Sequence, residues 1–169
     1  ERKRAEERLR EGEARFRAMA DSAPAPVWMT SAEGGITFAN EAFAEFAGLD
    51  AQDLLGDAWI GMIHPEDVAT VGARRAAARG APEGPRPWSF EARFRCGDGT
   101  YRWMVANARP QIDARGQFQG YIGMAMDMTE TKTAEARQRL LINELNHRVK
   151  NTLASIQSIV RQTLRADET

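Results

Sequence analysis

The residues best suited to chemistry lie in one polar segment near the C-terminal end of the sequence. Its central residue is His147, and a neutral imidazole that is exposed to solvent is a usable nucleophile near pH 7. Glu144 lies about one helical turn earlier, so its carboxylate could hold the second imidazole nitrogen and stabilise the imidazolium as it forms. The residues alone leave two interpretations open, a nucleophilic histidine or an ordinary surface histidine.

Further polar groups surround this histidine at helical spacing. Asn143 and Asn151 lie four residues before and after it, which places both amides on the same helix face. Arg148 and Lys150 add positive charge that could contact phosphate oxygens. We therefore retain Asn151 as a candidate supporting residue and Glu144 as a candidate orienting residue or base.

The remaining histidine and cysteine have simpler interpretations. His64 precedes Pro65 at a predicted helix start, which favours a capping or packing role over a haem or metal ligand. Cys96 ends a strand of alternating pattern, so we expect a small core residue. A single cysteine cannot form an internal disulfide, as expected in a reducing cytosol. Since no Cys/His spacing matches a zinc site and no glycine-rich phosphate loop occurs, we expect no metal site.

The polar segment belongs to a stretch that predicts one long helix. Residues 130–165 contain neither Gly nor Pro, and such a helix would be about 54 Å long. One face carries apolar residues at helical spacing: Ile142, Leu145, Val149, Leu153, Ile156, Val160 and Leu164. His147 is about 200° around the helix from Leu145 and therefore on the opposite side. This apolar stripe has no partner in the sequence, so we expect another chain or a further element to bury it.

The central part, residues 23–129, predicts an α+β domain. Its expected strands are Val27–Thr30, Ile36–Ala39, 89–96, 100–112 and 117–128. Its expected helices are 41–47, capped by Asn40, and 65–79. Two strands, then small helices, then three strands predict a five-stranded antiparallel sheet with helices against one face.

An N-terminal helix precedes this domain. Ala5, Leu9, Gly12, Phe16 and Met19 alternate at spacings of four and three, the pattern of a parallel coiled-coil seam. The prolines that follow Asp21 end the helix. We therefore divide the chain into an N-terminal signalling helix (1–22), the α+β domain (23–129) and a linker and bundle helix (130–169).

Charge and hydropathy exclude several function classes. The formal net charge is −1, which argues against a general nucleic-acid or membrane-surface binder. No apolar run reaches the length of a membrane span, and no signal peptide is present, so we expect a cytoplasmic protein. The sequence begins with Glu rather than Met, and we expect it to be part of a longer protein.

Residues 140–164 resemble the dimerisation and phosphoacceptor helix of the HWE family of sensor histidine kinases. The resemblance rests on the string Glu144-Leu-Asn-His147-Arg-Val-Lys-Asn151-Thr-Leu-Ala. It implies that His147 accepts phosphate. In the wider superfamily an acidic residue often follows that histidine, whereas Arg148 stands here, as suits the HWE branch. Which group acts as base stays open, with Glu144 as the candidate.

The central domain resembles a PAS sensor module. The resemblance rests on His64-Pro-Glu-Asp67, on Phe94-Arg-Cys-Gly-Asp-Gly-Thr-Tyr-Arg-Trp103 and on Asp127-Met-Thr129. It implies the PAS fold but not a ligand, which stays unknown. The Asn-Cys-Arg string of flavin-adduct photosensors is absent, so no covalent flavin is expected, and the position of His64 argues against haem. The closing Asp127 and Thr129 are implied to couple the last strand to the following helix.

Together the resemblances imply the sensory and phosphoacceptor portion of a two-component sensor histidine kinase, acting as a parallel homodimer. A nucleotide-binding lobe with ATP and Mg²⁺, which this sequence lacks, would phosphorylate His147, and the phosphoryl group would pass to an aspartate of a response regulator. We therefore expect no kinase activity from this chain alone. The alternative is a PAS dimerisation or small-ligand-binding module whose long helix is only a spacer.

Overall fold

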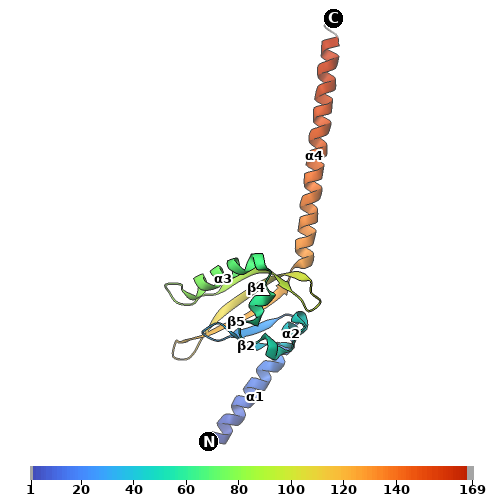
Figure 1. Ribbon diagram of the computed structural model, residues 1–169. Coiled ribbons are helices and arrows are strands. Elements are labelled where there is room, and N and C mark those ends of the chain that lie inside the picture. The colour runs from blue at the N-terminus through green and yellow to red at the C-terminus, as the bar shows by residue number, and fades with distance from the viewer. Residues whose placement is uncertain (1, 167–169) are drawn as a thin grey trace. The chain divides into compact units, whose positions relative to one another are not determined.

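The computed structural model describes residues 2–166, and the side chains of residues 2–157. The chain separates into two compact units with the boundary after Thr129. In chain order the elements are α1 (Arg2–Asp21), β1 (Val27–Thr30), β2 (Ile36–Ala39), α2 (Glu41–Ala47), the 3-10 helices η1 (Ala51–Leu54) and η2 (Ala58–Met62), α3 (Pro65–Arg79), β3 (Trp88–Arg95), β4 (Tyr101–Ile112), β5 (Phe118–Asp127) and α4 (Thr129–Ala166) (Figure 1).

The five strands form one antiparallel sheet in the order β2-β1-β5-β4-β3. The last strand in the sequence, β5, therefore lies at the centre of the sheet, between β1 and β4. This arrangement confirms the predicted α+β class and the five antiparallel strands. It also means that the strand leading into α4 touches both halves of the sheet.

One hydrophobic core lies between the sheet and the small helices. Phe90, Ala92 and Phe94 of β3 are buried, whereas the residues that alternate with them are exposed or half-buried. Phe43 of α2 and Val71 of α3 belong to the same buried cluster as these strand residues. The helices therefore cover a single face of the sheet, as the period-two pattern of the strands requires.

Two helix starts agree with the capping residues of the sequence. The Asn40 side chain accepts a hydrogen bond from the amide of Phe43 at the start of α2, and Gly48 ends that helix in the left-handed conformation (φ 64°). His64 caps α3, where Nδ1 accepts from the amide of Glu66 at 3.3 Å. The predicted capping role of His64 is confirmed.

The structure differs from the sequence-based expectation in several places, beyond shifts of one residue at other strand ends. The helix η2 was not expected, because five residues are too few to show a period. Strand β3 begins at Trp88, one residue early, because Trp88 pairs with Ala108 of β4. Phe16, a member of the predicted coiled-coil seam, packs against Phe38 of its own chain with ring centroids 5.2 Å apart.

Helix α4 runs from Thr129 to Ala166 without a break. Within a single chain its predicted apolar stripe is exposed from Ile142 to Ile156, while the stripe positions Val160 and Leu164 lie outside the described side chains. Among the described residues, no helix combines the length and the apolar character that crossing a membrane requires.

Candidate functional site

The polar segment around His147 occupies one side of α4. Its side chains are all exposed, as expected because α4 is the single described element of the second unit. At 100° per residue, Glu144, His147 and Asn151 point within about 60° of one another, roughly opposite the apolar stripe. A partner that covers the stripe would therefore leave this face open to solvent.

Glu144 is engaged by a neighbour on this face. Its carboxylate accepts a hydrogen bond from the Arg148 guanidinium at 2.7 Å, an ion pair at i,i+4 spacing. The pair holds the Glu144 carboxylate toward Arg148, one turn later on the helix. The orienting or basic role of Glu144, and the supporting role of Asn151, stay predictions.

An exposed imidazole between a carboxylate and two cations can take part in phosphoryl transfer. The unprotonated ring nitrogen can attack a phosphorus atom while the other nitrogen keeps its proton. Arg148 and Lys150 supply positive charge for the phosphate oxygens. Such chemistry would need a phosphoryl donor, brought to this face from elsewhere.

The junction between β5 and α4 has one internal hydrogen bond and three that connect it to the neighbouring strand β4. Asp127 Oδ1 accepts from the amide of Thr129 at 2.9 Å, so the aspartate caps the first turn of α4. The hydroxyl oxygen of Thr129 accepts from the amide of Trp103 on β4 at 3.0 Å. The Met128 amide donates to the carbonyl of Trp103 at 2.7 Å, and Arg102 donates to the second Asp127 oxygen at 3.3 Å.

The electrostatics of the junction favour a charged aspartate. Burial alone raises the pKa of Asp127, but hydrogen bonds from Thr129 and Arg102 outweigh it, and the net shift is downward. The structure therefore brings together the two residues that the PAS resemblance implicated in coupling. Their contacts reach β4 as well as the helix, which the sequence did not indicate.

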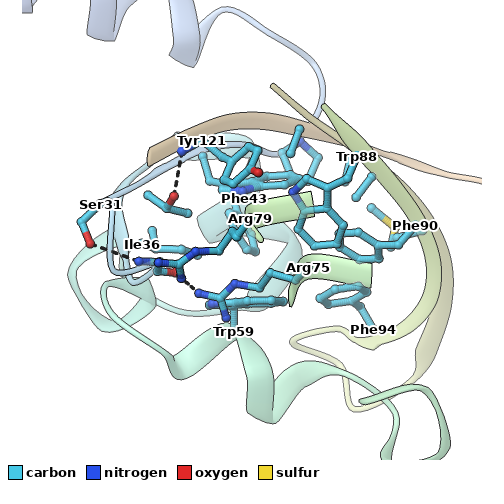
Figure 2. A pocket seen from close by; sticks show the side chains of 18 of the residues that line it. Ser31, Ile36, Phe43, Trp59, Arg75, Arg79, Trp88, Phe90, Phe94 and Tyr121 are labelled. Carbon is cyan, nitrogen blue, oxygen red and sulfur yellow. Dashed lines mark hydrogen bonds between the residues drawn. The ribbon is translucent and has the colours of Figure 1, made fainter. Parts of the chain in front are cut away.

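A cavity lies inside the first unit, between the sheet and α3, and no motif in the sequence predicted it. Its volume is about 50 Å³. Trp28, Trp59, Trp88 and Phe90 line it, and the Arg75 and Arg79 side chains lie across one side of it (Figure 2). The Arg75 and Arg79 positions are four residues apart on the predicted helix, a spacing that could have revealed a shared face.

His64 and Cys96 do not line this cavity. The Cys96 side chain is buried, and burial raises the pKa of its thiol, as the predicted core role requires. The His64 ring packs edge-on against Tyr101 with centroids 4.7 Å apart.

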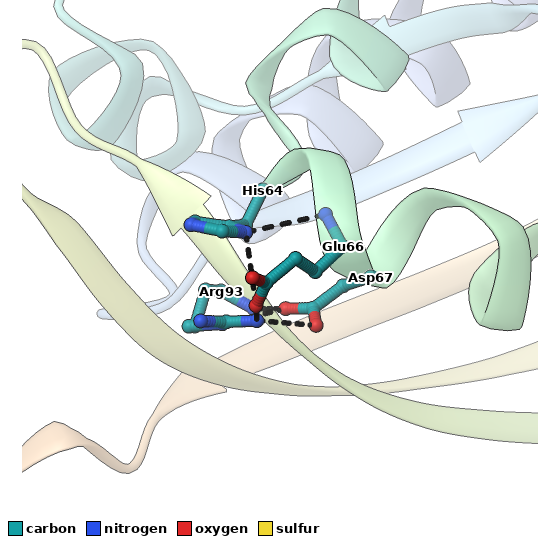
Figure 3. Close-up of polar contacts among 4 residues, drawn as sticks. All are labelled: His64, Glu66, Asp67 and Arg93. Atoms are coloured by element: carbon teal, nitrogen blue, oxygen red, sulfur yellow. Dashed lines mark hydrogen bonds and ion pairs between the residues drawn. The ribbon is translucent and has the colours of Figure 1, made fainter.

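His64 opens a polar cluster that connects α3 to the sheet. Asp67 accepts three hydrogen bonds from Arg93 of β3, two from the guanidinium and one from the backbone amide, and Glu66 accepts a fourth (Figure 3). Hydrogen bonding to Arg93 lowers the pKa of Asp67 more than its burial raises it. The contacts indicate a structural clamp, since the cluster lies outside the cavity.

Comparison with known families identifies both units. The PAS fold model matches residues 14–128, and the HWE histidine kinase model matches residues 144–169. The second match begins at Glu144, includes His147 and extends beyond the described side chains.

Known relatives and solved structures agree with these matches. The C4-dicarboxylate transport sensor protein DctS of Rhodobacter capsulatus is 35% identical over 135 residues, which cover 79% of this chain and 20% of that protein. A blue-light-activated histidine kinase of Brucella anthropi is 38% identical over 79 residues, or 46% of this chain and 16% of that protein. A crystal structure of a sensory box histidine kinase/response regulator from Burkholderia thailandensis aligns with a TM-score of 0.60 and 25% identity, covering 79% of this chain and 98% of that one.

The chain spans only 16–20% of the length of the first curated relatives it matches. Most of each relative therefore lies outside the region of similarity.

Proposed function

Because this chain belongs to the PAS-fold family and continues into an HWE histidine kinase region, we propose that it is the sensory and phosphoacceptor portion of a two-component sensor histidine kinase. The observation that carries the proposal is the exposed face of α4, where His147, Glu144 and Asn151 lie together opposite the apolar stripe. The related sensor DctS and the related blue-light-activated histidine kinase support the same class.

In the proposed reaction, the unprotonated nitrogen of His147 attacks the γ-phosphorus of ATP in line with the leaving ADP. The N–P bond forms as the P–O bond to the β-phosphate breaks, and Mg²⁺ offsets the charge on the phosphates. The sequence contains no glycine-rich phosphate-binding loop. A separate nucleotide-binding lobe would therefore supply the nucleotide. The chain alone would then accept a phosphoryl group but would not transfer one from ATP to itself. Because ATP is the donor, the proposed location of the reaction is the cytoplasm.

Nearby residues have proposed roles in this step. Glu144 orients the imidazole or acts as base, which requires that it exchange its contact with Arg148 for one with His147. Asn151 supports the same face from the next turn. The phosphoryl group then passes from the imidazole nitrogen to an aspartate carboxylate of a response regulator, which restores the neutral histidine.

Control of the reaction is proposed to pass through Asp127 and Thr129. Their hydrogen bonds join the first turn of α4 to β4 and β5, so a change in the sheet would alter the rotation or register of that turn. Two such helices would pair in a parallel homodimer through the apolar stripe.

The acceptor role is testable because the chain has two histidines, and the second offers a matched control. Radiolabelled ATP and a separately purified HWE-type nucleotide-binding lobe would be incubated with the wild-type chain, His147→Ala and His64→Asn. Asparagine is a good helix N-cap, so the His64 variant should keep α3 intact. We expect acid-labile, alkali-stable label on the wild type and His64→Asn, and none on His147→Ala.

Label that persists on His147→Ala would refute the assignment. So would an unlabelled wild-type chain beside a lobe that phosphorylates another acceptor. The chain would then be a PAS dimerisation or ligand-binding module with α4 as a spacer, the alternative that the sequence allowed.

A further inference from the structure

The cavity of the PAS unit has an apolar body and a small volume. The aromatic rings of Trp28, Trp59, Trp88 and Phe90 form much of its wall. Its volume of about 50 Å³ exceeds the roughly 10–15 Å³ that one water molecule needs, and is below the roughly 150 Å³ of a cavity that binds benzene. It therefore has room for fewer non-hydrogen atoms than the six of benzene, such as the short chain of a small acid whose carboxylate lies at the edge of the cavity.

The side-chain polar groups that line this cavity are mostly hydrogen-bond donors. No lining residue is Asp, Glu or His. The indole nitrogens of Trp59 and Trp88 are buried and have no hydrogen-bond partner among the described residues. An unpaired buried N–H carries a desolvation cost, which an acceptor atom that reaches it would remove.

Two arginines add positive charge at one side of the cavity. Arg75 donates to the carbonyl of Gly34 at 2.7 Å, and Arg79 donates to the carbonyls of Ala32 and Glu33. Among the described residues neither guanidinium has an ion pair with a carboxylate; Glu33 and Asp57 act on them only at longer range. Burial and the Arg79 charge lower the pKa of Arg75.

Gly34, which has no Cβ, leaves space for the Arg75 and Arg79 side chains. Its φ of 105° favours glycine, and a Cβ there would overlap the Arg75 guanidinium and come within 2.9 Å of Arg79. The two guanidinium groups therefore lie close over one turn of the β1–β2 loop, where they can bind one anion together (Figure 2).

We propose that this cavity binds a short-chain carboxylate with a second oxygen acceptor, such as a 2-oxo or 2-hydroxy acid. The carboxylate pairs with Arg75 and Arg79, the carbon chain lies among the aromatic rings, and the oxo or hydroxyl oxygen accepts from an indole N–H. That such a molecule acts as a signal rests on the proposed function. Ala125 of β5 lines the cavity two residues before Asp127, so a bound molecule touches the strand that leads into α4.

Binding can be measured directly on the full 169-residue chain by isothermal titration calorimetry. Three of the four tryptophans line the cavity, so their fluorescence gives a second readout. The probes are 2-oxobutyrate, its neutral amide, butyrate and succinate. Since a charge-assisted hydrogen bond exceeds a neutral one, 2-oxobutyrate should bind at least about tenfold more tightly than the amide and about three- to tenfold more tightly than butyrate.

Succinate should not bind, because its second carboxylate would be buried among aromatic rings. These comparisons use only the wild-type chain and do not depend on how any variant folds. Equal affinity for acid and amide, tighter binding of succinate, or no binding of either monoacid at millimolar concentration would each overturn the proposal.

Variants then locate the site. Arg79→Gln should reduce the preference for acid over amide, because only Arg75 then pairs with the carboxylate, and Trp88→Phe should reduce the preference for 2-oxobutyrate over butyrate. Arg74→Gln is the matched control, because Arg74 lies on the same helix but donates to Ser89 and does not line the cavity. An unchanged acid preference in Arg79→Gln, or its loss in Arg74→Gln, would refute the assigned site.

A failure of ligand binding can be distinguished from a failure of the proposed kinase function. Failure of binding while His147 still accepts phosphate would remove only the ligand class. Binding with the expected preferences in a chain whose His147 is never labelled would leave the ligand site standing and refute the kinase assignment.

Discussion

At the residue scale, Asn40 connects four parts of the PAS unit. It is fully buried, and its amide group donates to the carbonyls of Ala20 and Ala25 at 2.8 and 3.0 Å. Its oxygen accepts from the amides of Val27 and Phe43 at 2.8 and 3.1 Å. The sequence predicted only the last of these contacts, the helix cap, because the others join residues thirteen or more positions away.

We expect Asn40→Ala to lower the free energy of unfolding by about 2–4 kcal/mol, since it removes a cap and leaves several buried backbone groups unpaired. Urea unfolding followed by circular dichroism would measure the change. Asp50→Ala is the control: Asp50 is exposed at the start of η1 and makes no capping bond with its side chain, so its loss should cost about 0.5 kcal/mol or less. Similar losses from both variants would contradict the role of Asn40.

The clamp between Asp67 and Arg93 gives a pH dependence at the same scale. The pKa of Asp67 is lower in the folded chain than its ordinary value, chiefly through the hydrogen bonds from Arg93. The clamp therefore stabilises the fold fully above the ordinary carboxyl pKa of about 4, and the contribution is lost as the pH falls through the lowered pKa.

We expect Asp67→Asn to be less stable than the wild type near neutral pH and to lose less stability on acidification. Unfolding midpoints in urea between neutral and strongly acidic pH would test this. Glu66→Gln should show a smaller difference, because the Glu66 side chain is 74% exposed and accepts one bond from Arg93. Parallel pH profiles for the wild type and Asp67→Asn would refute the assignment.

At the scale of elements, α4 connects the Asp127–Thr129 junction to His147 over eighteen helical steps, about 27 Å along the axis. Insertions of one to four residues between Thr131 and Glu135 would rotate the His147 face by about 100° each. If signals pass as rotation, an insertion of two residues should give the least phosphorylation of His147 by the nucleotide-binding lobe, because it turns the histidine farthest away. An insertion of four residues completes roughly one turn and should restore phosphorylation. A flat response across the series would exclude rotation.

Prediction from the sequence was most accurate for the secondary-structure elements. The turn residues and the alternation of apolar residues predicted all five strands, because both signals are local. Helix η2, which carries Trp59 into the cavity, was not predicted, because one short turn has no period and its N-cap residue makes no side-chain cap bond.

At the scale of the whole molecule, the exposed stripe on α4 requires a partner. Leu145 and Val149 are 61% and 49% exposed in the single chain, and an apolar seam of this length is unstable in water. We expect a dimer in sedimentation equilibrium at micromolar concentration, and a monomer for the double variant Leu145→Lys and Val149→Lys. The control variant Lys150→Gln should stay dimeric, because Lys150 lies off the stripe. A wild-type chain that sediments as a monomer would contradict the proposed assembly.

The sequence by itself determined the polar face around His147 and the helices and strands other than η2, because both depend on residues close together in the chain. The string from Glu144 to Asn151 lies on a single helix, so its spacing already places the side chains on one face. The cavity depended on tertiary structure. Trp28, Trp59, Arg75 and Trp88 come from four elements, and only the packing of η2 and α3 against the sheet brings them to one cavity. The bond from Trp103 to Thr129 has the same origin, since the pairing of β4 with β5 joins residues twenty-six positions apart.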